Sequence, residues 1–250
     1  MKQRVKDLSL QDNLQDLQRL QVYLAHSGVA SRRACEKLIL EGRVAVDGEV
    51  VQTLGTKVSP SQCITVDGRE VFPEEKKHYL VLYKPEGCVS SLADEKGRAL
   101  AVDLLKPFFK ERLYNVGRLD MFSSGVLLFT NDGEFARTVS HPSSGIKKEY
   151  EITTLDMLPE DIAEKFKTGI RYEGVFYKAY SAQRVSSRKL KVVLIEGKNR
   201  EIRNMLSAFN IRIKKLLRTR LGPVDLQGLT PGKFRELNNL EIAELTKSKN

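Results

Sequence analysis

The stretch 115-NVGRLDMFSSGVLLFTNDGEF-135 sets the interpretation of the larger part of the chain. Residues 126–129 form a continuous apolar run, and the turn sequence 131-NDG-133 follows shortly after it. Such a short run beside turn residues predicts a strand that is buried in a sheet. Arg118 and Asp120 stand just before the run, and in an extended chain side chains two residues apart point to the same side. The stretch therefore predicts a core strand with an arginine and a carboxylate at its entrance.

Apolar patterns with the periods of strands and of helices follow one another through the rest of the larger region. We expect strands at 79–83, 150–153 and 190–195, and helices at 134–140, 159–168 and 200–209, with Asn199 as a cap of the last helix. These elements mix without a regular βαβ repeat. The fold class is therefore predicted to be α+β, with a mixed or antiparallel sheet flanked by helices.

A smaller pattern precedes this region. Residues 17–28 and 31–42 read as two short helices, each ended by a glycine, and Ser31 is placed to cap the second. Two Asp-Gly dipeptides, at 47–48 and 67–68, indicate tight turns between short strands. We therefore expect four segments: a flexible extension (1–16), a small α/β module (17–72), a linker (73–78) and a larger domain (79–250).

The chain is basic, with a formal net charge of +10 and a pI near 9.4. This balance points to an anionic partner, nucleic acid or a membrane surface, or else to a generally solvated basic surface. Part of the excess is local, because residues 198–220 hold eight Lys or Arg and one acid. We predict a phosphate-binding strip there. Arg32 and Arg33 also stand in the first turn of a predicted helix, where a phosphate ligand would relieve an unfavourable dipole.

Several other classes of protein are disfavoured by the sequence. The first residues, MKQRVKDLSLQDN, contain no apolar signal-peptide core, and no stretch reaches the length of a membrane span. The three cysteines form no CxxC and have no histidine at ligand spacing. This argues against disulfides and zinc and fits a reducing cytoplasm. The absence of a Gly-rich phosphate loop leaves no indication of a nucleotide cofactor.

Asp120 is the candidate for chemistry in the opening stretch. No group of carboxylates or histidines stands near it for a metal site, and no obvious second carboxylate for a glycosidase pair. Neither 123-SSG-125 nor 141-HPSSG-145 gives the GxSxG setting of a serine nucleophile. What remains is one aspartate whose pKa a nearby arginine would keep low. From the spacing alone, a structural salt bridge between Arg118 and Asp120 is the preferred interpretation.

Residues 17–72 resemble the ribosomal-protein S4 type of RNA-binding module, through 28-GVASRRACEKLILEGRVAVDGEVV-51 and 54-LGTKV-58. Residues 1–72 hold ten Lys or Arg against nine Asp or Glu, so a module of this kind would bind through a local patch. The resemblance implies that four cationic side chains face RNA phosphates: Arg32, Arg33, Lys37 and Arg43.

Residues 78–240 resemble the RsuA-type rRNA pseudouridine synthases, and most of all those that modify large-subunit rRNA. The matching motifs come in the order of that family: 84-KPEG-87, 117-GRLD-120, 124-SGVLL-128, 130-TNDG-133, 148-KEY-150, 196-EGKNREIRNM-205, 222-GP-223 and 228-GLTPGKFREL-237. The resemblance implies an isomerisation that uses neither cofactor nor metal. The glycosidic bond of a uridine is cleaved, the base rotates, and it rejoins the sugar through C5.

The resemblance also implies roles for single residues. Asp120 would be the catalytic carboxylate, which either attacks the sugar or assists proton removal. Tyr150 would stack on the uracil and take part in proton transfer, and Arg203 would pair with Asp120. Leu194 or Ile195 would pack beneath the base. The further RNA contacts of this domain would be Arg118, which fills the space left by the flipped nucleotide, Lys84, Lys198 and Arg200.

Three positions depart from the family pattern. Phe122 replaces an acidic or amide residue, Ser123 replaces a threonine, and Asn204 stands where a second arginine is common, which removes one expected phosphate contact. The expected catalytic residues are intact, so we expect a cytoplasmic, monomeric enzyme that acts on rRNA or a pre-ribosomal particle. The alternatives are a catalytically silent RNA-binding or ribosome-assembly protein and an RNA-modifying enzyme of another type, such as a methyltransferase.

Overall fold

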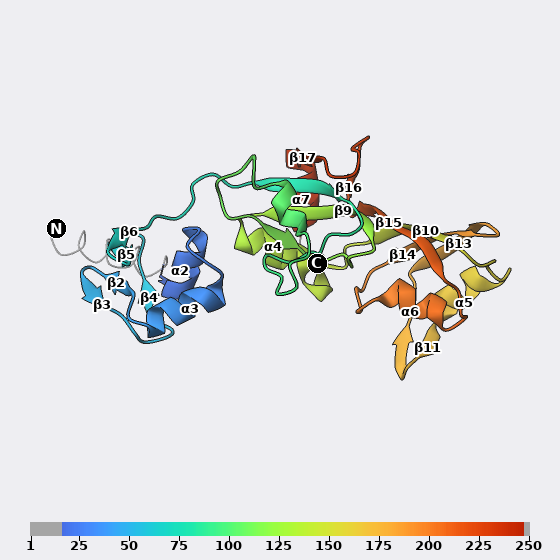
Figure 1. Cartoon of the computed structure of the whole chain (residues 1–250), viewed down its shortest axis with the longest axis horizontal. Helices are drawn as coiled ribbons and strands as arrows, with labels where there is room; N and C mark the ends of the chain where they lie inside the picture. Colours follow the sequence, from blue (N-terminus) through green and yellow to red (C-terminus); the bar gives the residue numbers. More distant parts are fainter. Residues whose placement is uncertain (1–16, 248–250) are drawn as a thin grey trace, which may run out of the picture. The chain divides into compact units, whose positions relative to one another are not determined.

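The computed structural model describes residues 17–247, and the predicted extension 1–16 lies outside the described residues. The chain forms two compact units, one that ends at Lys77 and one that begins at His78. Each unit has its own sheet and its own hydrophobic core, and the sequence colours of Figure 1 distinguish them.

The first unit contains two helices and short antiparallel strands. Helices α2 (Leu20–His26) and α3 (Arg32–Leu40) pack on a sheet of order β3 (Glu49–Val50), β2 (Val44–Val46), β5 (Ile64–Val66) and β6 (Arg69–Glu70). Ser31 Oγ accepts a hydrogen bond from the Ala34 amide at 3.2 Å, which confirms the predicted cap. Both predicted Asp-Gly turns are present. Helix α2 begins only at Leu20, because β1 (Gln18–Arg19) pairs with β4 (Lys57–Val58) as a strand.

The second unit is built on a nine-stranded sheet. Its main path runs β13 (Ser181–Ser186), β14 (Lys189–Leu194), β10 (Lys148–Thr154), β15 (Ile213–Leu221), β9 (Ser124–Thr130), β7 (Tyr79–Lys84) and β17 (Phe234–Glu236). Strand β8 (Tyr114–Val116) pairs with β9, and β16 (Val224–Asp225) pairs with β15. The β9–β15 pair is parallel and the other pairs are antiparallel. The predicted α+β fold with a mixed sheet is confirmed.

Strand β9 explains the apolar run of the opening stretch, because both faces of the sheet are covered there. Val126 and Leu128 belong to a core with helices α4 (Gly133–Ser140) and α7 (Asn239–Thr246). Leu127 and Phe129 belong to a second core, with the 3-10 helix η1 (Ala101–Leu104). Side chains of a strand alternate between its faces. A strand with a core on each face is therefore apolar throughout, and the predicted buried strand is confirmed.

The half of the sheet that contains β10 and β14 has a third core, to which helices α5 (Ile162–Thr168) and α6 (Glu201–Ser207) contribute. Figure 1 shows these helices together beside the strands, near the hairpin of β11 (Ile170–Tyr172) and β12 (Val175–Tyr177). The two halves of the sheet join where Arg218 of β15 pairs with Gly125 of β9. Gly125 has φ +112°, and a Cβ there would lie 2.1 Å from the Arg218 carbonyl oxygen. Only glycine permits this approach.

None of the helices in residues 17–247 has the length and the apolar character that a membrane crossing requires. The same residues contain no cluster of three His, Cys, Asp or Glu side chains that could hold a metal ion. The three cysteines are free thiols, two of them buried.

Candidate active site

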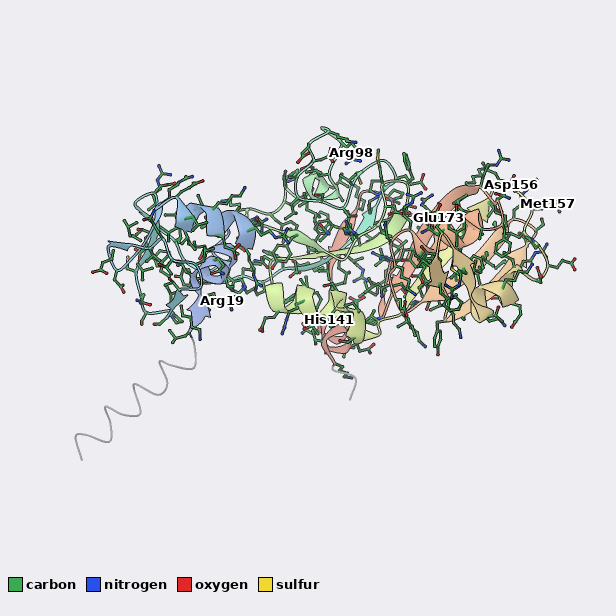
Figure 2. All side chains as sticks on the ribbon, turned by 90° about the horizontal axis from the view of Figure 1, so that it is seen from below. Arg19, Arg98, His141, Asp156, Met157 and Glu173 are labelled. Atoms are coloured by element: carbon green, nitrogen blue, oxygen red, sulfur yellow. The ribbon has the colours of Figure 1, made fainter. Side chains whose placement is uncertain are left out.

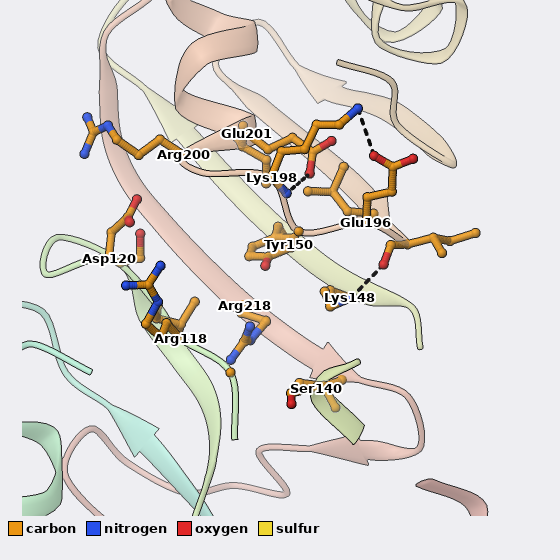
Figure 3. Close-up of a pocket in the computed structure, with 18 of the residues that line it drawn as sticks. Arg118, Asp120, Ser140, Lys148, Tyr150, Glu196, Lys198, Arg200, Glu201 and Arg218 are labelled. Carbon is orange, nitrogen blue, oxygen red and sulfur yellow. Dashed lines mark hydrogen bonds and ion pairs between the residues drawn. The ribbon is translucent and has the colours of Figure 1, made fainter. Parts of the chain in front are cut away.

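A cavity of about 690 Å³ opens in the second unit where the two halves of its sheet meet. Its walls come from the loop before β9, from β10, from the loop after β14 and from helix α6, segments that are far apart in sequence (Figure 3). The volume is in the range that holds a small ligand. Most of the predicted site residues line this cavity: Arg118, Asp120, Tyr150, Leu194, Ile195, Lys198, Arg200 and Arg203.

Asp120 lies in the loop before β9, and Arg203 reaches it from helix α6. Arg203 Nε donates to Asp120 Oδ2 at 3.3 Å, which is the predicted ion pair. The side chains are 16% and 34% exposed, so the pair belongs to the cavity wall rather than to open solvent. Within residues 17–247, Asp120 Oδ1 has no hydrogen-bond partner. One carboxylate oxygen is therefore available to a ligand.

Two cations hold the loop that carries Asp120. Arg203 Nη2 donates to the Phe122 carbonyl oxygen at 2.6 Å and to Ser123 Oγ at 3.1 Å. Lys84 Nζ donates to three backbone carbonyl oxygens at 2.9, 3.3 and 2.8 Å, those of Pro85, Met121 and Ser123. Lys84 is fully buried, and burial lowers the pKa of its ammonium group. The prediction that Lys84 contacts RNA is wrong, because protein encloses the side chain and uses it to support the loop.

The departures from the family pattern leave the Asp120–Arg203 pair in place. Phe122 contributes its backbone carbonyl to Arg203, while its side chain is 63% exposed. Ser123 is buried, and its hydroxyl supplies an oxygen that threonine would also supply. Asn204 Nδ2 donates to the Tyr177 hydroxyl and to the Asn199 carbonyl, at 2.8 and 3.2 Å, and so holds the beginning of α6.

Arg118 is exposed and lines the cavity together with Asp120 (Figure 3). In the described part of the chain no ion pair joins these two residues, and Asp120 is paired with Arg203 instead. The buried side chain between them, Leu119, packs into the core beside η1. The salt bridge that the spacing favoured is therefore wrong, and the partner of Asp120 comes from 83 residues further along the chain.

Aromatic and aliphatic side chains form another part of the cavity. Tyr150 stands on β10 and packs against two of the three cores of the second unit. Leu194 is buried and Ile195 is partly buried, and both line the cavity with Tyr150. An aromatic ring and aliphatic side chains around one cavity suit a planar base.

Some ionisable residues of the cavity are not among the single residues that the sequence marked for the site, among them Lys148, Glu201 and Arg218. Lys148 Nζ donates to the Ile195 carbonyl at 2.7 Å, and its pKa is lowered by burial and then by the charge of Arg218. Burial raises the pKa of the Glu201 carboxyl. Arg218 is 3% exposed. The sequence signal that could have indicated the burial of Arg218 is strand alternation. Residues two apart in a strand share a face, and Leu216 on the same face of β15 is buried.

The residues that lead into α6 form a turn at the edge of the cavity. Arg200 occupies the cap position with φ +51°, and Glu201 Oε2 accepts a hydrogen bond from the Lys198 amide at 3.1 Å. The predicted Asn199 cap is therefore wrong, because Glu201 reaches back to the turn instead. Lys198 Nζ is bound to the Glu196 carboxylate and the Phe176 carbonyl, both at 2.8 Å. Arg200 is exposed and has no such partner among the described residues.

The cations of residues 198–220 do not form one strip. Arg212 binds Asp156 at 2.6 Å at the periphery of the second unit (Figure 2), and Arg220 binds Asp225 at 2.9 Å. Arg218 is buried at the cavity. The structure does not arrange these cations as the predicted phosphate-binding strip, because carboxylates neutralise part of the charge and Arg218 is buried.

The four side chains of the first unit that were predicted to contact RNA differ in whether they already have a carboxylate partner. Arg32, Arg33 and Lys37 are exposed on α3, and none is hydrogen-bonded or ion-paired to another described side chain. Arg43 is instead held by Asp67, at 2.8 Å from Nε and 2.6 Å from Nη2, and by Glu41 at 3.4 Å. The first three are therefore free to meet phosphates, whereas Arg43 would have to leave its carboxylates.

Two family models match the chain, RNA pseudouridylate synthase over residues 78–208 and S4 domain over residues 18–64. Ribosomal large subunit pseudouridine synthase B of Bacillus subtilis is 41% identical over 235 residues, which cover 92% of this chain and 96% of that protein. An uncharacterized RNA pseudouridine synthase of Aquifex aeolicus is 39% identical, with 92% and 94% covered. A crystal structure of a pseudouridylate synthase matches with a TM-score of 0.66 and 25% identity, covering 91% of this chain and 99% of that one.

The chain therefore belongs to the RNA pseudouridine synthases. The expected resemblance to the RsuA-type members, which carry an S4 domain before the catalytic domain, is confirmed. The cavity that contains Asp120 is accordingly the candidate active site of an RNA-modifying isomerase.

Proposed function

We propose that this protein converts a specific uridine of ribosomal RNA to pseudouridine without a cofactor, with Asp120 as the catalytic carboxylate. The observation that carries the proposal is the Asp120–Arg203 pair at 3.3 Å in the wall of a cavity that Tyr150 also lines. Large-subunit rRNA is the proposed substrate, and the Bacillus subtilis relative named for that subunit supports this choice.

The conversion of uridine to pseudouridine is consistent with a site that has a single carboxylate with one unpartnered oxygen. Uridine joins C1′ to N1 of the base, and pseudouridine joins C1′ to C5. The reaction breaks the first bond, forms the second, removes the proton of C5 and adds one at N1, so nothing is oxidised and no group is gained. Asp120 would act through its unpartnered Oδ1, by attack at C1′ or by removal of a sugar proton.

The other cavity residues would serve binding and orientation. Tyr150 would stack on the uracil and take part in proton transfer, with Leu194 or Ile195 beneath the base. Arg118 would occupy the gap that the flipped nucleotide leaves in the RNA. Lys198 and Arg200, at the edge of the cavity, would contact phosphates.

The first unit would capture the RNA. Residues 17–72 would bind a folded segment through Arg32, Arg33 and Lys37, with Arg43 contributing after release from Asp67, while residues 79–250 would carry the reaction. We propose that the protein acts as a monomer in the cytoplasm, where a ribosomal RNA or a pre-ribosomal particle would be its partner.

The test is to incubate the purified protein with fragments of rRNA in the absence of any cofactor and to map pseudouridine by carbodiimide treatment and primer extension. We expect a single new stop with the wild type, in large-subunit rRNA, and none with Asp120→Ala. Asp156→Ala is the matched control, because Asp156 also pairs with an arginine but lies outside the cavity. Modification by Asp120→Ala at the wild-type rate would contradict the role of Asp120, and no new stop with the wild type would contradict the function.

A further inference from the structure

Arg218 is a charged residue of the cavity whose hydrogen-bonding capacity the protein uses only in part. The residue is 3% exposed, and its Nε donates to the Val126 carbonyl oxygen at 2.7 Å. Its Nη2 is buried and has no hydrogen-bond partner within residues 17–247. A guanidinium is always charged and offers five N–H donors, and a buried donor without a partner costs free energy. An unpaired donor on a residue that lines a cavity points to a ligand atom that completes it.

The position of Arg218 is fixed by the centre of the sheet. On β15 it lies directly opposite Tyr150 of β10, and directly opposed residues of an antiparallel pair share one face. On its other side it pairs with Gly125 of β9. Its charge also contributes to the lowered pKa of Lys148, after burial. Figure 3 shows Arg218 among the lining residues, with Tyr150 and Arg118 near it in the view.

Because Arg218 Nη2 is buried, the base of a flipped nucleotide can reach it but the phosphates cannot. The phosphates continue into the polymer and must stay at the open edge, where Arg118 and Arg200 are exposed. A flipped base is planar and carries two carbonyl oxygens, O2 and O4, into the cavity. Because Nη2 is closed to solvent, contact with the base requires a side chain of the cavity wall to move aside. The ligand chemistry that fits is a uracil carbonyl oxygen.

We propose that Arg218 is a further catalytic residue, which donates an N–H to a carbonyl oxygen of the target uracil and stabilises the uracil anion. When C1′–N1 breaks, the bonding electron pair leaves with the base, and the negative charge spreads over N1 and the carbonyl oxygens. C1′ is taken up by the Asp120 carboxylate, or the sugar loses its C2′ proton to a base. C5 then bonds to C1′ while the C1′–Asp120 bond breaks or, on the second route, while C2′ regains its proton. The C5 proton departs and N1 takes up a proton. A fixed, buried donor aimed at developing charge is an effective way to lower such a barrier.

This inference rests on the proposed function, and its test uses the full chain in single-turnover reactions on an RNA that contains the target uridine. We expect Arg218→Gln to lower the rate constant about 10²–10³-fold, the usual effect of removing one donor from a developing anion. Arg218→Lys keeps the charge and should recover part of the rate. The dissociation constant for RNA should change less than about threefold, because the contact forms chiefly as charge develops. Lys191→Gln, an exposed β14 cation paired with Glu151, is the matched control and should react at the wild-type rate.

A second arm changes the base instead of the protein. Fluorine at C5 withdraws electrons and stabilises the uracil anion without help from the enzyme. With RNA that carries 5-fluorouridine at the target, the defect of Arg218→Gln should be at least about tenfold smaller than with uridine. The measurement is the loss of 5-fluorouridine from nuclease digests, followed by mass spectrometry. An equal defect on the two substrates would overturn the proposal.

The outcomes separate this proposal from its rivals. A raised dissociation constant with a flatter salt dependence would assign Arg218 to a phosphate and overturn the proposal. Wild-type rates for both Arg218 variants would assign it to structure alone, while the proposed function would still stand if Asp120→Ala is inactive. If both variants fail to fold, the structure of the wild type bound to the fluorinated RNA decides. Arg218 Nη2 should then lie about 3 Å from O2 or O4, and a separation beyond about 4 Å would overturn the proposal.

Discussion

The Arg43–Asp67 pair of the first unit and the Arg203–Asp120 pair of the second differ in nearly every physical respect. In the first unit, Arg43 meets Asp67 through two contacts, at 2.8 and 2.6 Å. Both side chains are about half exposed, at 46% and 50%. In the second unit, Arg203 meets Asp120 through one contact at 3.3 Å, and the side chains are 16% and 34% exposed.

The comparison shows that the tighter pair is not the one at the candidate active site. Asp67 offers both carboxylate oxygens to Arg43, so neither is left for a ligand. Asp120 gives only Oδ2 to Arg203, and Arg203 Nη2 donates to the Phe122 carbonyl oxygen and to Ser123 Oγ in the loop. A carboxylate that reacts needs an open oxygen and a cavity beside it, and only the second pair lines the 690 Å³ cavity.

The largest expected effect comes from removing the charge of each aspartate in turn. Asp120→Asn should lower the single-turnover rate constant by about 10⁴-fold or more, as loss of a catalytic group usually does. Asp67→Asn should change it by less than about threefold, because that carboxylate only pairs with an exposed arginine. Carbodiimide mapping over time measures both. A comparable loss in the two variants would remove the distinction between the pairs.

Replacing the arginine of each pair tests the same comparison, with a smaller expected effect. Arg203→Met should lower the rate constant about 10²–10³-fold, because Asp120 and the loop of residues 120–123 lose their common anchor. Arg43→Met should leave the rate constant unchanged and weaken RNA binding less than about threefold, since Asp67 and Glu41 already neutralise it. Saturating single-turnover kinetics separates rate from affinity. A rate effect of Arg43→Met would give the first pair a part in the reaction.

The opening stretch explains how much of the fold the sequence could predict. The run at 126–129 is apolar because cores lie on both faces of β9. Burial on both faces produces a continuous apolar run, which can be recognised in the sequence. The Asp-Gly turns and the Ser31 cap depend on local backbone chemistry and are equally visible. The Asn199 cap was mistaken because Glu201 competes for the same turn.

The candidate site was predictable only where a family motif marks the residues. The motifs led to Asp120, Tyr150 and Arg203, and the structure brings all three to one cavity. Lys84 and Arg218 show the limit. A lysine or arginine in sequence suggests a solvated or phosphate-binding side chain, yet Lys84 is buried on three carbonyls and Arg218 is buried on β15. Contacts between segments far apart along the chain contribute most to such cases, and local sequence patterns give little indication of them.

Gly125 of the second unit and Gly48 of the first allow the backbones of the two units to be compared in the same way. Gly125→Ala should destabilise the second unit by about 3 kcal/mol, because a Cβ at φ +112° would lie 2.1 Å from the Arg218 carbonyl oxygen. Gly48→Ala in the first unit should cost about 1 kcal/mol, since φ is also positive but nothing lies within 4 Å. Amide hydrogen exchange of the full chain reports each unit separately. Equal costs would mean that the β9–β15 contact adjusts freely.

The exposed cations of α3 should affect binding rather than reaction. Arg32→Glu together with Arg33→Glu should raise the dissociation constant for RNA about tenfold or more at low salt and reduce the steepness of its salt dependence, because two phosphate contacts are lost. The single-turnover rate constant at saturating RNA should remain that of the wild type. Fluorescence titrations at several salt concentrations give the slope. An unchanged slope would exclude these arginines from the RNA contact.

The smallest effect concerns the pH dependence of stability contributed by the Arg43–Asp67 pair. The hydrogen bond from Arg43 lowers the pKa of Asp67 below its ordinary value of 3.8. A carboxyl whose pKa is depressed on folding stabilises the folded state above its unfolded pKa and loses that contribution as the pH falls through the folded pKa. Asp67→Asn should therefore reduce the stability of the first unit slightly and evenly above about pH 5, and the difference from the wild type should shrink below pH 4. Hydrogen exchange or denaturant unfolding at several pH values measures it. Because the pair is exposed, high salt should reduce the stability difference between Asp67→Asn and the wild type at neutral pH. A stability difference that persists at low pH would mean that Asp67 stabilises the turn by something other than its charge.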